Sequence, residues 1–228
     1  MERATLIHGS EPRLGRLLQA FLRRYAASEA RAIAPFVVGS RLLDLGAGEG
    51  YVTTALRQQT EIWACAVDIG PYQRASEPYL IYDGVRLPFR DATFDTALMS
   101  LALHHCADPQ RVLDEALRVT RSRLIILESV YRNRWDCFWL ERLDGALNRY
   151  RHQGKMHRHL AFKSPQQWQQ LFDDRHLRTI DRRWLGSWWE RLVHQPLLFV
   201  LDKVAFPRGC WHERGNLTGE GADTRLGP

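Results

Sequence analysis

The sequence has few cysteines and no long apolar run, and each scarcity excludes a class of protein. Its 228 residues include four scattered cysteines, so we predict neither a disulfide framework nor a metal site. No stretch reaches the roughly 18 apolar residues of a membrane-spanning helix, and Met1–Ile7 has no apolar run of a secretory signal behind it. We therefore expect a cytoplasmic protein without a membrane span, and a chain of this length suits one α/β domain.

Three glycines lie close together between a predicted strand and a predicted helix. Residues 41–45 form a short apolar run and residues 51–59 read as a helix, with Gly46, Gly48 and Gly50 between them. Glycine at such a turn allows a ligand to approach the backbone closely. A Gly-x-Gly pattern alone is not specific, so the neighbouring residues must decide what it binds.

Acidic residues accompany the predicted strands around this turn. Asp44 lies two residues before the first glycine, where a dinucleotide fingerprint normally has an apolar residue. Asp68 ends a predicted strand at 62–67, and Asp83 follows another at 79–82. Each of them could simply cap a helix or turn, but together they predict a cofactor site.

Later motifs follow in a recognisable order. They are the turn Leu87-Pro88-Phe89, a strand at 96–103, His104-His105, a helix at 110–119 and a strand at 124–127. With the glycine turn and the three acids, the stretch 41–130 resembles the class I S-adenosylmethionine-dependent methyltransferases, and specifically their small-molecule "type 11" branch. The resemblance implies a Rossmann-like α/β fold with a seven-stranded, mostly parallel sheet, helices on both faces and an antiparallel last strand.

The resemblance also assigns roles toward S-adenosyl-L-methionine, whose product is S-adenosyl-L-homocysteine. The glycines would pack against the amino acid part of the cofactor, and Asp44 would orient the loop or the ammonium group. The remaining contacts would be Asp68 with the ribose, Asp83 with the adenine and the Ser100 backbone near the sulfonium. The predicted cofactor site therefore consists of Asp44, Gly46, Gly48, Asp68, Asp83 and Ser100.

His104 and His105 are the candidate catalytic residues. They follow the fourth predicted strand, at the edge where the methyl group should be presented, and an imidazole can remove a proton near neutral pH. The methyl is already activated by the sulfonium, so positioning alone can supply roughly 7–11 kcal/mol of the barrier. Members of the family often have a histidine pair here without a base role, so both readings stay open.

The chain is predicted to be a single methyltransferase domain over residues 1–206, followed by a polar, disordered tail at 207–228. The domain divides into an N-terminal helical lid (1–40), the cofactor-binding half (41–130), a helical insert on the substrate side (131–163) and a C-terminal helix with two strands (164–206). Prolines between Asp68 and Tyr79 should reduce the usual helix there to a turn.

The predicted insert has an aromatic stripe and a basic run. The stripe (Trp135, Phe138, Trp139, Leu143 and Leu147) could line an apolar pocket or belong to the core. The run (His152, Lys155, His157, Arg158 and His159) lacks a carboxylate or cysteine at a ligand spacing. We expect it to be a solvated loop or to hold an anionic group.

Positive charge is concentrated around this insert. Residues 118–183 carry 15 lysines and arginines against seven acidic residues, while the whole chain has a net charge of +6. Arginine suits carboxylate or phosphate groups, although a basic solvated face is an equally good reading.

We expect methyl transfer to the oxygen, nitrogen or carbon of a small organic molecule that is aromatic or anionic. The basic segment raises an alternative, an RNA methyltransferase, but the sequence has no recognisable RNA-binding module and no Asn-Pro-Pro-Tyr after the fourth strand. Nucleic acid is therefore disfavoured. A non-catalytic binding module with the same fold is the third reading, and the oligomeric state stays open.

Overall fold

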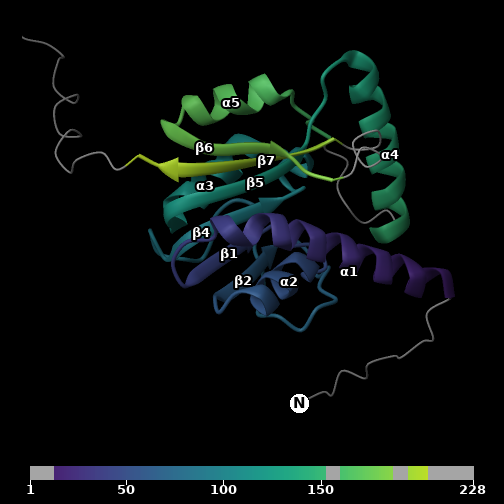
Figure 1. The fold of residues 1–228 in the computed structure, drawn as a ribbon, viewed down its shortest axis with the longest axis horizontal. Helices are drawn as coiled ribbons and strands as arrows, with labels where there is room; N and C mark the ends of the chain where they lie inside the picture. Colours follow the sequence, from purple (N-terminus) through teal and green to yellow (C-terminus); the bar gives the residue numbers. More distant parts are fainter. Residues whose placement is uncertain (1–12, 153–159, 187–194, 205–228) are drawn as a thin grey trace, which may run out of the picture.

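A sheet of seven strands forms the centre of the computed structural model, which describes residues 13–152, 160–186 and 195–204 (Figure 1). In chain order the elements are α1 (Arg13–Ile33), η1 (Ala34–Phe36), β1 (Arg41–Leu45), α2 (Tyr51–Gln59), β2 (Trp63–Asp68), β3 (Tyr79–Ile81), β4 (Phe94–Ser100), η2 (Leu103–His105), α3 (Pro109–Val119), β5 (Thr120–Ser129), α4 (Arg134–His152), α5 (Pro165–Asp173), β6 (Leu177–Trp184) and β7 (Pro196–Lys203).

The order of the strands confirms the predicted fold class. The sheet runs β3-β2-β1-β4-β5-β7-β6. Strands β1 to β5 pair in parallel, and β7 is antiparallel to both of its neighbours. The chain leaves β1 toward β2 on one side and returns to β4 on the other, so the carboxyl ends of β1 and β4 flank the point where α/β sheets bind ligands.

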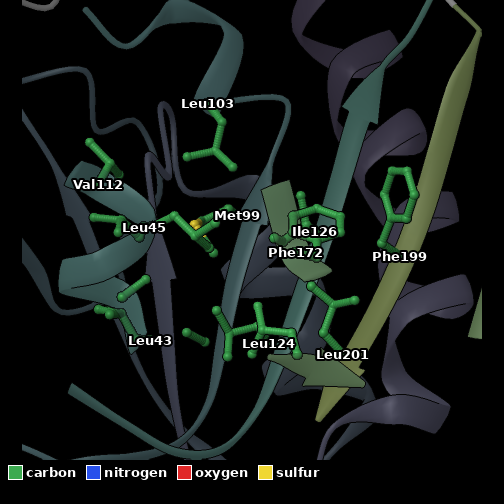
Figure 2. Close-up of a cluster of buried hydrophobic side chains, with 14 of the residues drawn as sticks. Leu43, Leu45, Met99, Leu103, Val112, Leu124, Ile126, Phe172, Phe199 and Leu201 are labelled. Carbon is green, nitrogen blue, oxygen red and sulfur yellow. The ribbon is translucent and has the colours of Figure 1, made fainter. Parts of the chain in front are cut away.

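Alternate side chains of the central strands pack into two separate hydrophobic cores, one on each face of the sheet. Leu43 and Leu45 of β1 face the core that α3 and α5 cover, which Figure 2 shows in close-up. Leu42, between them, faces the core that α1 and α2 cover. Strands buried on both faces read as continuous apolar runs, and helices therefore cover both sides of this sheet, as predicted.

The start of α5 shows how the sequence determines an element boundary. The Ser164 hydroxyl accepts a hydrogen bond from the Gln167 N–H, and the Gln167 side chain accepts one from the Ser164 N–H. Pro165 occupies the first turn, where its missing N–H costs nothing. This capping box confirms the predicted helix start and directs Trp168 into the core.

Some strand limits were predicted wrongly, among them the end of β4 and both ends of β5, which runs from Thr120 to Ser129 and not from 124 to 127. The apolar run 96–103 suggested a strand to Leu103, but β4 begins at Phe94 and ends at Ser100. The Leu101 N–H still donates to the Leu127 carbonyl of β5, but Leu101 has φ +53°, a left-handed conformation that cannot continue a strand. The apolar pattern could not reveal this turn, because Leu103 is buried all the same.

The connection from β2 to β3 contains no helix, as its prolines predicted. Residues 13–33 do form a helix, but its role as a lid stays a prediction. The tail at 207–228 and the histidines at 157 and 159 lie outside the described residues. Among the helices that the structure describes, none combines the length and apolarity needed to cross a bilayer.

Candidate active site

The glycine turn between β1 and α2 is held against the next strand of the sheet. The N–H groups of Gly46 and Ala47 donate to the Val67 carbonyl at 2.8 and 3.2 Å. Gly46 has φ +79°, and a Cβ on it would lie 2.4 Å from the Cβ of Ala102. Gly48 has φ +53°, and a Cβ there would meet nothing within 4 Å. Gly46 is therefore required for packing, whereas Gly48 presents bare backbone to open space.

Asp68 ends β2 directly behind this open backbone. Its Oδ2 accepts a hydrogen bond from the Gly48 N–H at 2.7 Å, and its Oδ1 accepts one from the Ile69 N–H at 2.7 Å. Burial raises the pKa of the carboxyl group, and the N–H group of Gly48 opposes that rise. Each carboxylate oxygen can accept a further hydrogen bond, so Asp68 can bind hydroxyl groups while it holds the turn.

Asp44 is buried one strand away. Its Oδ2 accepts a hydrogen bond from the Thr53 hydroxyl of α2 at 2.5 Å, which ties β1 to the helix that follows the turn. Burial raises the pKa of Asp44 to about 6, and the charge of Asp68 adds to the rise. A buried carboxylate near a second carboxylate favours a cationic ligand. Sequence reasoning missed Thr53. The available signal was its position in the first turn of the helix that follows the glycines.

Asp83 behaves differently from the other two acids. Its side chain is exposed, and Oδ1 accepts hydrogen bonds from the N–H groups of Val85 and Arg86 at 2.8 and 2.9 Å. These bonds lower the pKa of the carboxyl group. Asp83 therefore caps the turn after β3, the alternative that the sequence left open, and its contact with adenine stays a prediction.

A buried carboxylate that sequence reasoning missed organises the turn after β4. Glu128, near the end of β5, is fully buried. Its Oε1 accepts hydrogen bonds from the N–H groups of Ala102 and Leu103 at 3.2 and 2.7 Å. Its Oε2 lies 2.6 Å from Nδ1 of His104. Because Ala102 is the residue that Gly46 packs against, Glu128 also positions the glycine turn. The available signal was an acidic residue directly after the apolar run 124–127.

The two candidate catalytic histidines differ in accessibility. His104 is 1% exposed, and its ring stacks on Phe162 with 4.6 Å between centroids. The His104 carbonyl accepts a hydrogen bond from the Ala161 N–H, which ties the end of the insert to this turn. His105 is partly exposed. Of the two, His105 has the access to solvent that contact with a substrate requires, whereas the surroundings of His104 suit a positioning role.

The short connection between β2 and β3 closes one side of the glycine turn. The N–H groups of Arg74 and Ala75 donate to the Glu49 carbonyl at 3.1 and 3.0 Å. Ala75 also lies beside Gly50, 3.3 Å from where a Cβ would stand. Loss of the usual helix thus leaves a loop that packs directly on the candidate cofactor loop.

The structure brings all six predicted cofactor residues to the carboxyl edge of neighbouring parallel strands. Asp44, Gly46, Gly48 and Asp68 lie at the ends of β1 and β2, and Ser100 lies at the adjacent end of β4. Asp83 follows β3 at the outer end of the sheet. This edge offers acids and bare backbone, so it can bind a ligand with cationic and hydroxyl groups.

Comparison with known proteins identifies the same region. A family model described as a methyltransferase domain, of type 11, matches residues 43–126. A demethylmenaquinone methyltransferase of Mycolicibacterium paratuberculosis is 35% identical over 112 residues, which are 46% of this chain and 47% of that protein. One of Paenarthrobacter aurescens is 32% identical over 99 residues, or 40% and 39% of the two chains. These matches span less than half of the relatives' own length.

Solved structures with the same fold cover more of the chain. A geranyl diphosphate methyltransferase in complex with S-adenosylmethionine aligns with a TM-score of 0.63 at 15% identity, over 87% of this chain and 94% of that one. The [4+2]-cyclase SpnF aligns with a TM-score of 0.62 at 16% identity, over 79% and 81%. Such distant likeness establishes the fold alone. The chain therefore has the class I methyltransferase fold, and its residues 43–126 are similar to a methyltransferase domain of type 11.

Proposed function

We propose that this protein binds S-adenosyl-L-methionine at the carboxyl edge of β1 and β2 and transfers its methyl group to a small organic molecule. The observation that carries the proposal is the pairing of Gly48 with Asp68. Bare backbone in a left-handed conformation faces open space, with a strand-end carboxylate directly behind it. The bound cofactor supplies an activated methyl group.

The residues around the loop fit this ligand chemically. The donor has hydroxyl groups for Asp68 and an ammonium group for Asp44, whose buried carboxylate gains from a cation. Gly48 leaves room for the amino acid part, which Gly46 would contact through its backbone, and the Ser100 backbone would lie near the sulfonium. Asp83 would reach the adenine with the oxygen that does not cap its turn.

Catalysis in this scheme depends mainly on positioning. Glu128 and His104 would hold the turn after β4, and His105 would remove a proton where the acceptor carries one. Demethylmenaquinone heads the acceptors to be screened because the curated relatives bear its name, and aromatic and anionic small molecules follow. The expected compartment is the cytoplasm.

The test is calorimetric titration with S-adenosyl-L-homocysteine, which needs no acceptor. We expect micromolar binding to the wild type and a loss of about 1.5–3 kcal/mol in Asp68→Ala, the range for hydrogen bonds to a charged group. Asp91→Ala removes an exposed carboxylate from another loop and is the matched control. Circular dichroism would verify that each variant is folded.

Either outcome is informative. A folded wild type that does not bind the product would overturn the methyltransferase assignment and favour a binding module with this fold. Binding that Asp68→Ala leaves unchanged would mean that the cofactor lies elsewhere.

A further inference from the structure

Helix α4 exposes an apolar face that the fold does not use. Trp135, Phe138, Trp139 and Leu143 are 75%, 43%, 56% and 43% exposed. Their spacing of three and four residues puts them on one side of the helix. The core reading of this stripe is therefore wrong for these four residues, and the side chain of Leu147 lies outside the described residues.

The exposed residues form one patch and are not scattered single side chains. Phe138 and Trp139 contact each other edge to face, with ring centroids 5.5 Å apart. Among the described side chains of α4, only Leu140 is buried, and it lies on another side of the helix. Figure 1 shows α4 at one end of the sheet, beside its edge and not across a face. Contiguous exposed apolar patches mark interaction sites.

Arginines accompany the aromatic rings. The Arg142 guanidinium lies 5.1 Å from the ring centroid of Phe138, and Arg132 and Arg134 are exposed where the helix begins. α4 also has acidic residues, of which Asp136 pairs with Arg132 at 3.3 Å. The wider segment 118–183 nevertheless has a net charge of +8, so the remainder of the chain has a net charge of −2.

Exposed tryptophans beside arginines indicate which kind of partner would cover this face of α4. Tryptophan prefers the level of the lipid headgroups, and arginine is attracted to anionic lipids. A second copy of this chain would bring two such basic segments together across a two-fold interface, because the same patch occurs on both sides. Opposite charge therefore favours an anionic bilayer surface over self-association.

We propose that α4 docks this protein on anionic membranes through Trp135, Phe138, Trp139 and Leu143. β5 ends at the carboxyl edge of the sheet, where the candidate active site lies, and α4 begins five residues later. Docking there turns this edge toward the bilayer, from which an apolar acceptor can enter. The proposal goes beyond methyl transfer, and it can be tested without any cofactor or acceptor.

The test is co-sedimentation of the full chain with vesicles of phosphatidylglycerol and phosphatidylcholine, and with phosphatidylcholine alone. We expect binding to the anionic vesicles, and at least about a tenfold loss in a Trp135→Ala/Trp139→Ala variant, because each ring gives up a large buried apolar area. The control is Trp63→Ala, which removes a 46% exposed tryptophan at the opposite edge of the sheet. Its affinity for vesicles should not change.

Several results would overturn the proposal. The first is that the wild type does not bind anionic vesicles. The second is that Trp63→Ala loses as much vesicle affinity as the double variant. The third is that the wild type forms a concentration-dependent dimer that the double variant does not form. Titration with S-adenosyl-L-homocysteine distinguishes these failures from failure of the proposed function, because the double variant should retain that binding.

Discussion

Replacing Asp44 with asparagine should make the protein more stable above pH 6 and weaken cofactor binding. The pKa of Asp44 is raised from 3.8 to about 6 because the carboxyl group is buried. Between these values the folded protein holds a proton that the unfolded chain has released, so the free energy of unfolding falls as the pH rises from about 4 to 6. A rise of roughly two pH units corresponds to about 3 kcal/mol.

Asparagine cannot ionise, so Asp44→Asn avoids this loss. It can still accept the Thr53 hydrogen bond, while its buried NH₂ group costs about 1 kcal/mol for want of a partner. We therefore expect Asp44→Asn to unfold at a higher urea concentration than the wild type at pH 8, by about 2 kcal/mol, and to lose this advantage below pH 4.

Calorimetry then tests the function of the same group. If Asp44 binds the ammonium of the cofactor, wild-type affinity for S-adenosyl-L-homocysteine should rise as the pH increases through about 6, because only the ionised carboxylate attracts the cation. The variant should bind about tenfold more weakly and lack this pH dependence. A variant that is less stable than the wild type at pH 8 would refute the reasoning, since it would mean that the charge of Asp44 stabilises the fold. Asp91→Asn, at an exposed position, controls for the general effect of removing a negative charge.

Three further predictions follow from the site. Gly48→Ala should cost only about 1–2 kcal/mol of folding free energy for its left-handed backbone yet abolish binding of S-adenosyl-L-homocysteine, whereas Gly46→Ala should destabilise the protein more because its Cβ meets Ala102; equal urea midpoints would contradict this. Glu128→Gln should lower the free energy of unfolding by about 1–3 kcal/mol, because its NH₂ group would replace one carboxylate oxygen, either the one that accepts from the two backbone N–H groups or the one beside His104 Nδ1; unchanged stability would show that the carboxylate does not hold the turn. RNA titrated at several salt concentrations should show no steep, salt-dependent affinity, and finding one would revive the RNA methyltransferase alternative.

The sequence predicted the fold well where the spacing of apolar residues and the position of turn residues indicated the same element limits. The limits of β1 and α2 were predicted at the same residues at which the structure has them, because a buried strand, a glycine turn and a helix follow each other without ambiguity. The end of β4 was missed because Leu103 is as apolar as the strand before it. Its N–H instead meets Glu128, and no local pattern reports a contact that spans 25 residues.

The candidate site shows the same division. Glycines and strand-end acids are local signals, so the sequence could assign both Gly48 and Asp68 to one cofactor site, although it did not predict the hydrogen bond between them. The roles of the acids could not be separated in this way, because burial decides them. Asp44 and Asp83 have similar positions after or within a strand, but one is buried with a raised pKa and the other is exposed with a lowered pKa.

That contrast bears on how the site would respond to its ligand. Asp44 and Asp68 are both buried near the glycine turn, and the charge of Asp68 makes ionisation of Asp44 harder. A cationic ligand beside Asp44 would reverse this effect, so that binding releases a proton near pH 6. An anionic ligand would have the opposite effect. The buried acids therefore favour a donor with a positive charge over a nucleotide whose charge lies on phosphates, which is the distinction that the glycine pattern alone could not make.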